Sequence, residues 1–141
     1  MKPTVGYSGT ALAKKLGIKE GSRVFVVDAP KDYAKLVEPL PPDVQLVPRL
    51  DAQTDMVHIF ARERKRLRGA LESALAKLQP AGTIWVSWPK KASKVPTDIT
   101  EDTVRELALP LGLVDIKVCA VDEVWSGLKL VLRKGNRARL R

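Results

Sequence analysis

The stretch Arg23-Val24-Phe25-Val26-Val27-Asp28 decides the fold, because four consecutive apolar residues end at an acidic one. An uninterrupted apolar run of this length is typical of a strand that is buried on both faces of a parallel sheet. Two later runs have the same character, Met56-Val57-His58-Ile59-Phe60 and Thr83 to Trp88. Together the three runs predict a central parallel sheet.

Helical patterns separate these runs. The longest lies between the second and third, where apolar residues recur with a 3.6-residue period and Pro80-Ala81-Gly82 ends the helix. Its stripe consists of Leu67, Ala70, Leu71, Ala74, Leu75 and Leu78. Shorter elements are expected as a helix at Leu12 to Leu16 that ends at Gly17, a helix at Lys31–Val37, a strand at Val44–Val47, and a helix that is capped by Asp98 or Thr100 and ends at Gly112.

The last part of the chain predicts a β-hairpin. Two apolar runs, Val114–Val121 and Leu128–Leu132, flank the turn-like segment Asp122–Gly127, so the two strands should be antiparallel neighbours. Strands that alternate with helices predict a Rossmann-like α/β fold with a mostly parallel sheet of about six strands and helices on both faces. We expect one domain over residues 1–132 and a basic tail over residues 133–141.

Composition excludes several classes of protein. The chain has 141 residues, 45% of them hydrophobic, which is ordinary for a globular domain. The single Cys119 excludes an intramolecular disulfide and a multi-cysteine zinc site. No run approaches the roughly 20 apolar residues of a membrane helix, and the first residues lack the apolar stretch of a secretory signal. We therefore expect a soluble, cytoplasmic protein with no metal site and no membrane contact.

Several motifs together resemble a small bacterial family known only as a domain of unknown function. The resemblance implies a fold but no established activity. The motifs are Tyr7-Ser8-Gly9-Thr10 with Leu12 to Ile18, Trp85-Val86-Ser87-Trp88-Pro89-Lys90-Lys91-Ala92-Ser93, Thr97-Asp98-Ile99-Thr100-Glu101-Asp102, and Gly112-Leu113-Val114-Asp115 through Lys117-Val118-Cys119-Ala120 to Trp125-Ser126-Gly127-Leu128-Lys129.

The order of elements, and the closing hairpin above all, is also similar to a shortened S-adenosylmethionine-dependent methyltransferase. That resemblance implies a glycine-rich turn directly after the first strand. The turn here, Asp28-Ala29-Pro30-Lys31-Asp32-Tyr33, contains no glycine, and Pro30 lacks a backbone N–H. We therefore expect no cofactor, and a divergent methyltransferase stays an alternative.

Residues that follow the parallel strands form the first candidate site, because ligands of open α/β sheets bind at the carboxyl ends of the strands. Lys90 and Lys91 could attract an anion, Ser93 could donate a hydrogen bond, and Asp98 could organise the loop. The alternative is that the lysines are solvated loop charges and Asp98 a helix cap. The complete predicted ligand-binding set is Tyr7, Ser8, Asp28, Lys90, Lys91, Ser93 and Asp98.

The hairpin connection forms a second candidate site, with Asp122, Glu123, Trp125 and Ser126. Paired acids beside an aromatic ring could bind a cation or a polar ligand. The alternative is an ordinary turn, in which the Asp side chain bonds nearby backbone and the Trp packs on the sheet.

No catalytic group stands out. His58 lies inside an apolar strand without a Ser-His-Asp or Cys-His arrangement, so a buried structural histidine is expected. Cys119 is expected to behave as a small buried hydrophobe. Lys117 interrupts an apolar strand, which is typical of an edge strand protected against aggregation.

The net charge of +9 comes from 25 Lys+Arg against 16 Asp+Glu, and two segments carry the excess. A basic helix start and a basic tail could bind nucleic-acid phosphates without sequence preference, although a tail of this kind is often only solubilising. The residues are Arg62, Arg64, Lys65, Arg66, Arg68, Arg133, Lys134, Arg137, Arg139 and Arg141.

The sequence thus favours a non-catalytic domain that binds a small anionic ligand or a protein partner. Non-specific nucleic-acid binding and a divergent methyltransferase are the alternatives.

Overall fold

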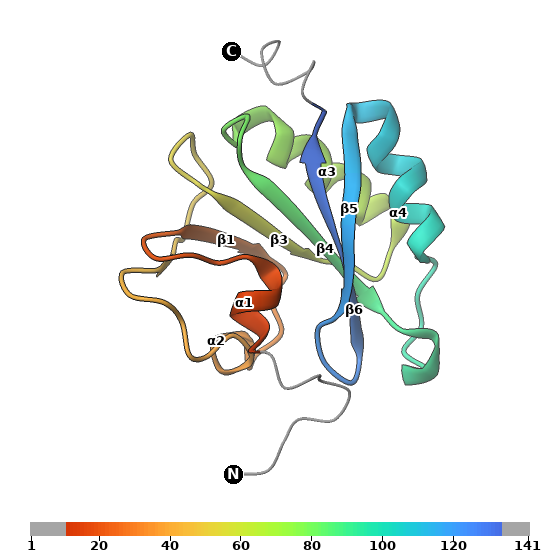
Figure 1. The fold of residues 1–141 in the computed structure, drawn as a ribbon. Coiled ribbons are helices and arrows are strands. Elements are labelled where there is room, and N and C mark those ends of the chain that lie inside the picture. The colour runs from red at the N-terminus through yellow and green to blue at the C-terminus, as the bar shows by residue number, and fades with distance from the viewer. Residues whose placement is uncertain (1–10, 134–141) are drawn as a thin grey trace.

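The computed structural model describes residues 11–133, which form a six-stranded sheet with helices on both faces (Figure 1). The strand order is β2–β1–β3–β4–β6–β5, with β1 to β4 parallel. This arrangement confirms the Rossmann-like fold. The strands are β1 (Arg23–Val27), β2 (Gln45–Leu46), β3 (Met56–Phe60), β4 (Thr83–Pro89), β5 (Leu113–Ala120) and β6 (Trp125–Leu132).

The C-terminal hairpin is also confirmed. Strand β6 lies between β4 and β5 and is antiparallel to both. It begins three residues before the expected start at Leu128, because Trp125 pairs with Pro89 of β4 and continues the ladder there. The expected start of this strand was therefore wrong. Strand β5 forms one edge of the sheet, as predicted from Lys117.

The helices form two layers (Figure 1). On one face lie α1 (Leu12–Leu16) and α2 (Tyr33–Leu36), and on the other α3 (Arg64–Lys77) and α4 (Glu101–Ala108). Short 3₁₀ turns occur at Lys91–Ser93 and Leu109–Leu111. Gly17 ends α1 with a φ of 83°, a left-handed conformation that glycine adopts without strain.

Each layer has its own apolar core. On the α3 side, Leu67, Leu71 and Ala74 of the predicted stripe are buried against β3, β4 and β6. On the α1 side, Trp85 is fully buried and its indole Nε1 donates a 2.8 Å hydrogen bond to the carbonyl oxygen of Leu16. That bond fixes the end of α1 to the middle of the sheet.

Thr100, and not Asp98, caps α4. The backbone N–H of Thr103 donates to Thr100 Oγ1 at 3.2 Å, and the N–H of Thr100 donates to Thr103 Oγ1 at 3.1 Å. Asp98 serves another helix, because its carboxylate accepts a 2.6 Å hydrogen bond from the backbone N–H of Arg64, the first residue of α3. The loop before α4 is thereby tied to the start of α3.

None of the helices within residues 11–133 has the length and apolar character needed to cross a membrane.

Candidate functional site

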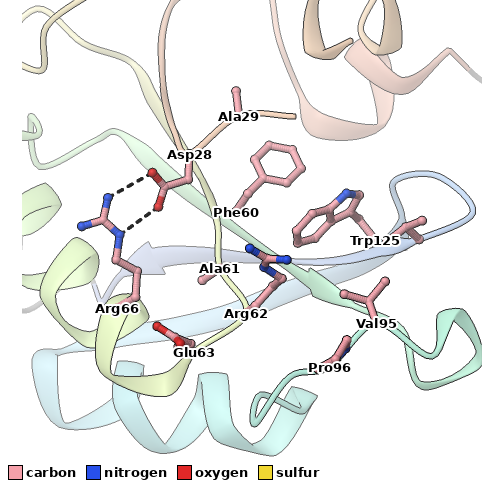
Figure 2. A pocket seen from close by; sticks show the side chains of 11 residues that line it. Asp28, Ala29, Phe60, Ala61, Arg62, Glu63, Arg66, Val95, Pro96 and Trp125 are labelled. Atoms are coloured by element: carbon pink, nitrogen blue, oxygen red, sulfur yellow. Dashed lines mark hydrogen bonds and ion pairs between the residues drawn. The ribbon is translucent and has the colours of Figure 1, made fainter. Parts of the chain in front are cut away.

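A cavity of about 860 Å³ opens at the carboxyl ends of β1 and β3 (Figure 2). This is the edge of the sheet where ligands of open α/β folds bind. Four segments contribute to its wall: the turn after β1, the end of β3 with the start of α3, the loop before α4, and the end of the β5–β6 connection with the start of β6. The lining residues are Asp28, Ala29, Phe60, Ala61, Arg62, Glu63, Arg66, Val95, Pro96, Val124 and Trp125.

A double hydrogen bond between Asp28 and Arg66 borders the cavity. Arg66 Nε donates to Asp28 Oδ2 at 2.8 Å, and a second guanidinium nitrogen donates to Oδ1 at 3.0 Å. These hydrogen bonds lower the pKa of Asp28, which keeps the carboxylate ionised. Asp28 has a φ of 55°, so the turn after β1 uses the left-handed conformation although it contains no glycine. The two hydrogen bonds thus engage the Asp28 carboxylate and the Arg66 guanidinium with each other.

Arg62 is the second arginine of the cavity. Its carbonyl oxygen accepts hydrogen bonds from Thr97 Oγ1 at 2.7 Å and from the backbone N–H of Asp98 at 3.2 Å. These bonds fix the backbone of Arg62, whereas its guanidinium forms no hydrogen bond or ion pair within residues 11–133. Figure 2 shows this guanidinium on the side of the cavity where Trp125 lies.

Two aromatic rings form an apolar part of the wall. Phe60 and Trp125 meet edge to face, with ring centroids 5.0 Å apart and an interplanar angle of 87°. Phe60 is buried and Trp125 half-buried, so the indole faces the cavity from a fixed position. Such a wall suits the planar or apolar part of a ligand.

Behind Phe60 lies a buried polar network. His58 stacks on Phe60 with centroids 4.3 Å apart. The Nδ1 of His58 is hydrogen-bonded to Tyr33 Oη at 3.0 Å, and its Nε2 to Ser87 Oγ at 2.7 Å. Burial lowers the pKa of His58 to about 3, and burial also raises the pKa of Tyr33.

His58 is therefore neutral at physiological pH and has no exposed surface. Both ring nitrogens are occupied by protein groups, so the ring does not reach the cavity as an acid or a base. This confirms the predicted buried structural histidine. Its contact with the cavity is indirect, through the position of Phe60.

The lysine loop does not line the cavity. Lys90 precedes the 3₁₀ turn, and Ser93 Oγ donates a 2.7 Å hydrogen bond to the carbonyl oxygen of Lys90, so this loop is held by its own residues. Of the five described members of the predicted ligand-binding set, Asp28 alone is among the lining residues. Asp98 lies beside them through its hydrogen bonds, and Tyr7 and Ser8 fall outside the described residues.

The hairpin candidate divides into two parts. Asp122 Oδ1 accepts hydrogen bonds of 2.8 Å from the backbone N–H groups of Val124 and Trp125. This is the ordinary turn in which an Asp side chain bonds nearby backbone. Trp125 faces the cavity, while Glu123 and Ser126 are not among its lining residues. The cavity thus receives Trp125 from the second candidate site and Asp28 from the first.

Intramolecular ion pairs involve three arginines of the basic helix start. Arg64 pairs with Glu106 at 2.9 Å, Arg66 with Asp28 at 2.8 Å, and Arg68 with Glu72 at 3.6 Å. Lys65 is exposed on α3, and Arg133 is exposed directly after β6. The remaining predicted nucleic-acid contacts, Lys134, Arg137, Arg139 and Arg141, lie outside the described residues.

Arg62 and Arg66 were predicted as nucleic-acid contacts and not as residues of the ligand-binding edge. Phe60, Glu63, Val95, Pro96 and Val124 were missed as lining residues. A local signal could have placed Arg62 and Glu63 at this edge, because Ala61, Arg62 and Glu63 directly follow the predicted strand that ends at Phe60.

Among residues 11–133 no group of three His, Cys, Asp or Glu side chains could hold a metal ion. Cys119 is half-buried, and burial raises the pKa of its thiol despite the opposing charges of Lys15 and Lys117. A thiol in this state is a poor nucleophile.

The fold and the position of the cavity define a Rossmann-like protein with methyltransferase-like topology, and solved structures share this fold. A candidate type 11 methyltransferase from Sulfolobus solfataricus aligns with a TM-score of 0.61 and 14% identity, over 87% of this chain and 90% of that one. An S-adenosylmethionine-dependent methyltransferase from Aquifex aeolicus gives 0.59 and 15%, over 84% and 86%. The tRNA methyltransferase TrmK of B. subtilis gives 0.57 and 12%, over 94% and 70%. At these identities the likeness concerns the fold alone.

The sequence itself identifies the family. Residues 13–134 match the family described as "Protein of unknown function (DUF3052)", and the chain belongs to it. The resemblance to a family of unknown function is thus confirmed. No curated protein is recognisably similar in sequence.

Proposed function

We propose that this protein binds a small anionic ligand in the cavity at the carboxyl ends of β1 and β3. The proposal rests on the guanidinium of Arg62, which has no partner within residues 11–133 and lines the same cavity as the aromatic wall of Phe60 and Trp125. A guanidinium is a planar fork of donors that matches a carboxylate or a phosphate. The aromatic wall would receive the planar or apolar remainder of the ligand.

The cavity is electrically balanced overall, so the anion is recognised locally. Two arginines, Arg62 and Arg66, line the cavity together with two acids, Asp28 and Glu63. Asp28 neutralises Arg66, and Figure 2 shows the Glu63 carboxylate on the α3 side, away from Trp125. The aromatic end of the cavity therefore carries the positive charge of Arg62, and the α3 end does not favour an anion.

A thermal-shift panel tests this proposal. Carboxylate- and phosphate-bearing metabolites, with and without a planar ring, would be added to the full chain. We expect some of them to raise the melting temperature, and the rise to disappear in Arg62→Gln. Arg64→Gln is the matched control, because Arg64 is a neighbouring exposed arginine that pairs with Glu106 and does not line the cavity.

Two outcomes would overturn the assignment of this cavity. A panel without any response would contradict the binding of a small anionic ligand. A response that survives in Arg62→Gln would show that Arg62 does not bind the ligand. The double variant Lys90→Ala, Lys91→Ala tests the lysine loop in parallel. If the rise in melting temperature disappears in that variant but persists in Arg62→Gln, the ligand binds at the lysine loop and not in the cavity.

A divergent S-adenosylmethionine-dependent methyltransferase is the second candidate function. It is favoured by the fold of the solved relatives and by a cavity at the corresponding edge of the sheet. The turn after β1 argues against it, because Pro30 supplies no N–H donor and the side chain of Asp28 is engaged by Arg66. Isothermal titration calorimetry with S-adenosylmethionine and its demethylated product tests this candidate. A methyltransferase must bind both, so the absence of binding heat for either would rule it out.

A further inference from the structure

Three lysines that are far apart in sequence meet on the α1 face of the sheet. Lys117 of β5 pairs directly across the strands with Lys129 of β6. Lys19 follows α1, and its positive charge contributes to lowering the pKa of Lys129. We call Lys19, Lys117 and Lys129 the lysine surface. Lys15 adjoins it, because the Nζ of Lys117 donates a 2.9 Å hydrogen bond to the carbonyl oxygen of Lys15.

This arrangement is electrostatically unfavourable for the isolated protein. Like charges directly opposite each other on neighbouring strands destabilise a sheet. Partial burial lowers the pKa of Lys129, and the charges of Lys117 and Lys19 lower it further. None of these three lysines forms an ion pair with an acid of residues 11–133, where the described ion pairs all involve arginines.

A purely structural role accounts for only part of the cluster. Lys117 uses one of its three N–H donors to cap a carbonyl at the end of α1, where a positive charge also favours the helix dipole. One lysine is enough for that role. The repulsion between Lys117 and Lys129 remains, so an external anion would stabilise this surface.

The surface is accessible and distinct from the cavity. Figure 1 shows α1 and α2 mainly over the β1 and β3 half of this face. The end of α1 approaches the hairpin, because Lys15 Nζ donates a 3.4 Å hydrogen bond to the carbonyl oxygen of Ala120 and Lys129 Nζ lies close to Gly17. Lys19 and Lys117 are exposed and Lys129 is half-buried. None of the three lines the cavity. The positive charges are spread over two strands and the segment after α1, which suits an extended polyanion.

We propose that the lysine surface binds the phosphodiester backbone of a nucleic acid. Lysine ammonium groups act as point charges that accept phosphates in many orientations, which suits contact without base recognition. The net charge of +9 would assist the approach of such a polyanion. The expected binding is independent of sequence and strongly dependent on salt.

Fluorescence anisotropy tests the proposal with labelled single-stranded RNA, single-stranded DNA and duplex DNA of one length, over a series of salt concentrations. Each of Lys117→Gln and Lys129→Gln should weaken binding and reduce the slope of log affinity against log salt by about 1. Lys77→Gln is the matched control, because Lys77 is an exposed lysine at the end of α3 on the opposite face. It should leave the slope close to that of the wild type. The three nucleic acids separate the possible sources of the phosphodiester.

A second measurement separates binding from folding. Lys129→Gln removes a repelling charge, so its free energy of unfolding should equal or exceed that of the wild type while its affinity falls. The proposal is overturned if Lys77→Gln has the same effect as the two surface variants. It is also overturned if an acidic peptide of equal charge binds as tightly as the nucleic acids and responds to the same variants.

Two further outcomes would refute the assignment. Binding that is lost on truncation after Leu132 but unchanged in Lys117→Gln and Lys129→Gln would assign it to the tail. Unchanged binding together with self-association of Lys117→Gln in size-exclusion chromatography would show that Lys117 only protects the edge strand.

Discussion

Asp28 and Arg66 join the end of β1 to α3 through two hydrogen bonds of 2.8 and 3.0 Å. The pair stands beside the proposed ligand site, and it determines how many positive charges of the cavity an anion can use. With Arg66 engaged, Arg62 is the guanidinium left for the ligand. Breaking the pair from its acidic side should therefore change ligand binding more than it changes folding.

Asp28→Asn should strengthen the binding of an anionic ligand, because it frees Arg66 and removes a negative charge from the wall. The increase in the ligand-induced melting shift measures this effect. Stability should change little, since both side chains are about half exposed and such pairs contribute weakly. Glu72→Gln is the control, because it frees Arg68 outside the cavity. Equal melting shifts in wild type and Asp28→Asn would contradict the prediction.

The same pair predicts a pH effect. Because the pKa of Asp28 lies below 3.8 in the folded protein, the pair stabilises the fold above that pH, and this contribution is lost as the pH falls through the lowered pKa. Asp28→Asn should lack that component in urea titrations at acid pH. Identical acid profiles of the two proteins would show that the pair contributes nothing.

His58 predicts a second acid effect, at higher pH. Its pKa is about 3 in the folded protein and near 6.5 when unfolded, so only the unfolded chain takes up the proton between these values. Stability from this group is complete above pH 6.5 and falls by up to about 1.4 kcal/mol per pH unit as the pH is lowered towards 3.

The measurement for His58 is the free energy of urea unfolding from pH 7.5 to 4. Wild type should lose stability faster than His58→Gln, whose amide can still bond Tyr33 and Ser87 but does not titrate in this range. Parallel curves for the two proteins would mean that the pKa of His58 is the same in the folded and unfolded chains.

Trp85→Phe should destabilise the α1 layer. The substitution keeps most of the apolar bulk but leaves the Leu16 carbonyl without its buried donor, which costs about 1–3 kcal/mol. Chemical denaturation gives the total, and hydrogen exchange should show the loss of protection concentrated in residues 12–18. Trp88→Phe is a useful control, because Trp88 is buried on the opposite face of the sheet. Equal losses of α1 protection in both variants would contradict the role of the hydrogen bond.

Thr100→Ala should cost about 1 kcal/mol, because the N–H of Thr103 loses its acceptor at the start of α4. Thr100→Ser retains the hydroxyl and should restore most of the stability, as measured by urea unfolding. Failure of Ser to rescue would point to the lost methyl group in place of the cap.

The strands of the sheet were predictable where their signal is local. Met56 to Phe60 is apolar throughout, and the strand has these bounds. The start of β6 was missed because Trp125-Ser126-Gly127 has the composition of a turn. What makes it a strand is its pairing with Pro89, Trp88 and Ser87 of β4, which lie almost forty residues earlier in the chain.

The residues of the candidate site were likewise predictable only where their signal is local in the sequence. Asp28 was predicted because it directly follows a strand, and the structure brings it to the cavity. The role of Arg62 depends on contacts with Thr97 and Asp98, which no local pattern reveals. The pairing of Lys117 with Lys129 likewise depends on a register shift in β5 after Asp115. Long-range pairing therefore sets the features that the sequence alone left open.

The aromatic wall of the cavity also provides an optical reporter. The chain contains three tryptophans, of which Trp85 and Trp88 are buried and Trp125 faces the cavity. Their emission spectrum should therefore combine a constant blue component from the two interior indoles with one component that responds to the cavity. A molecule that covers Trp125 would change the latter alone, so the unlabelled protein can report occupancy by its own fluorescence.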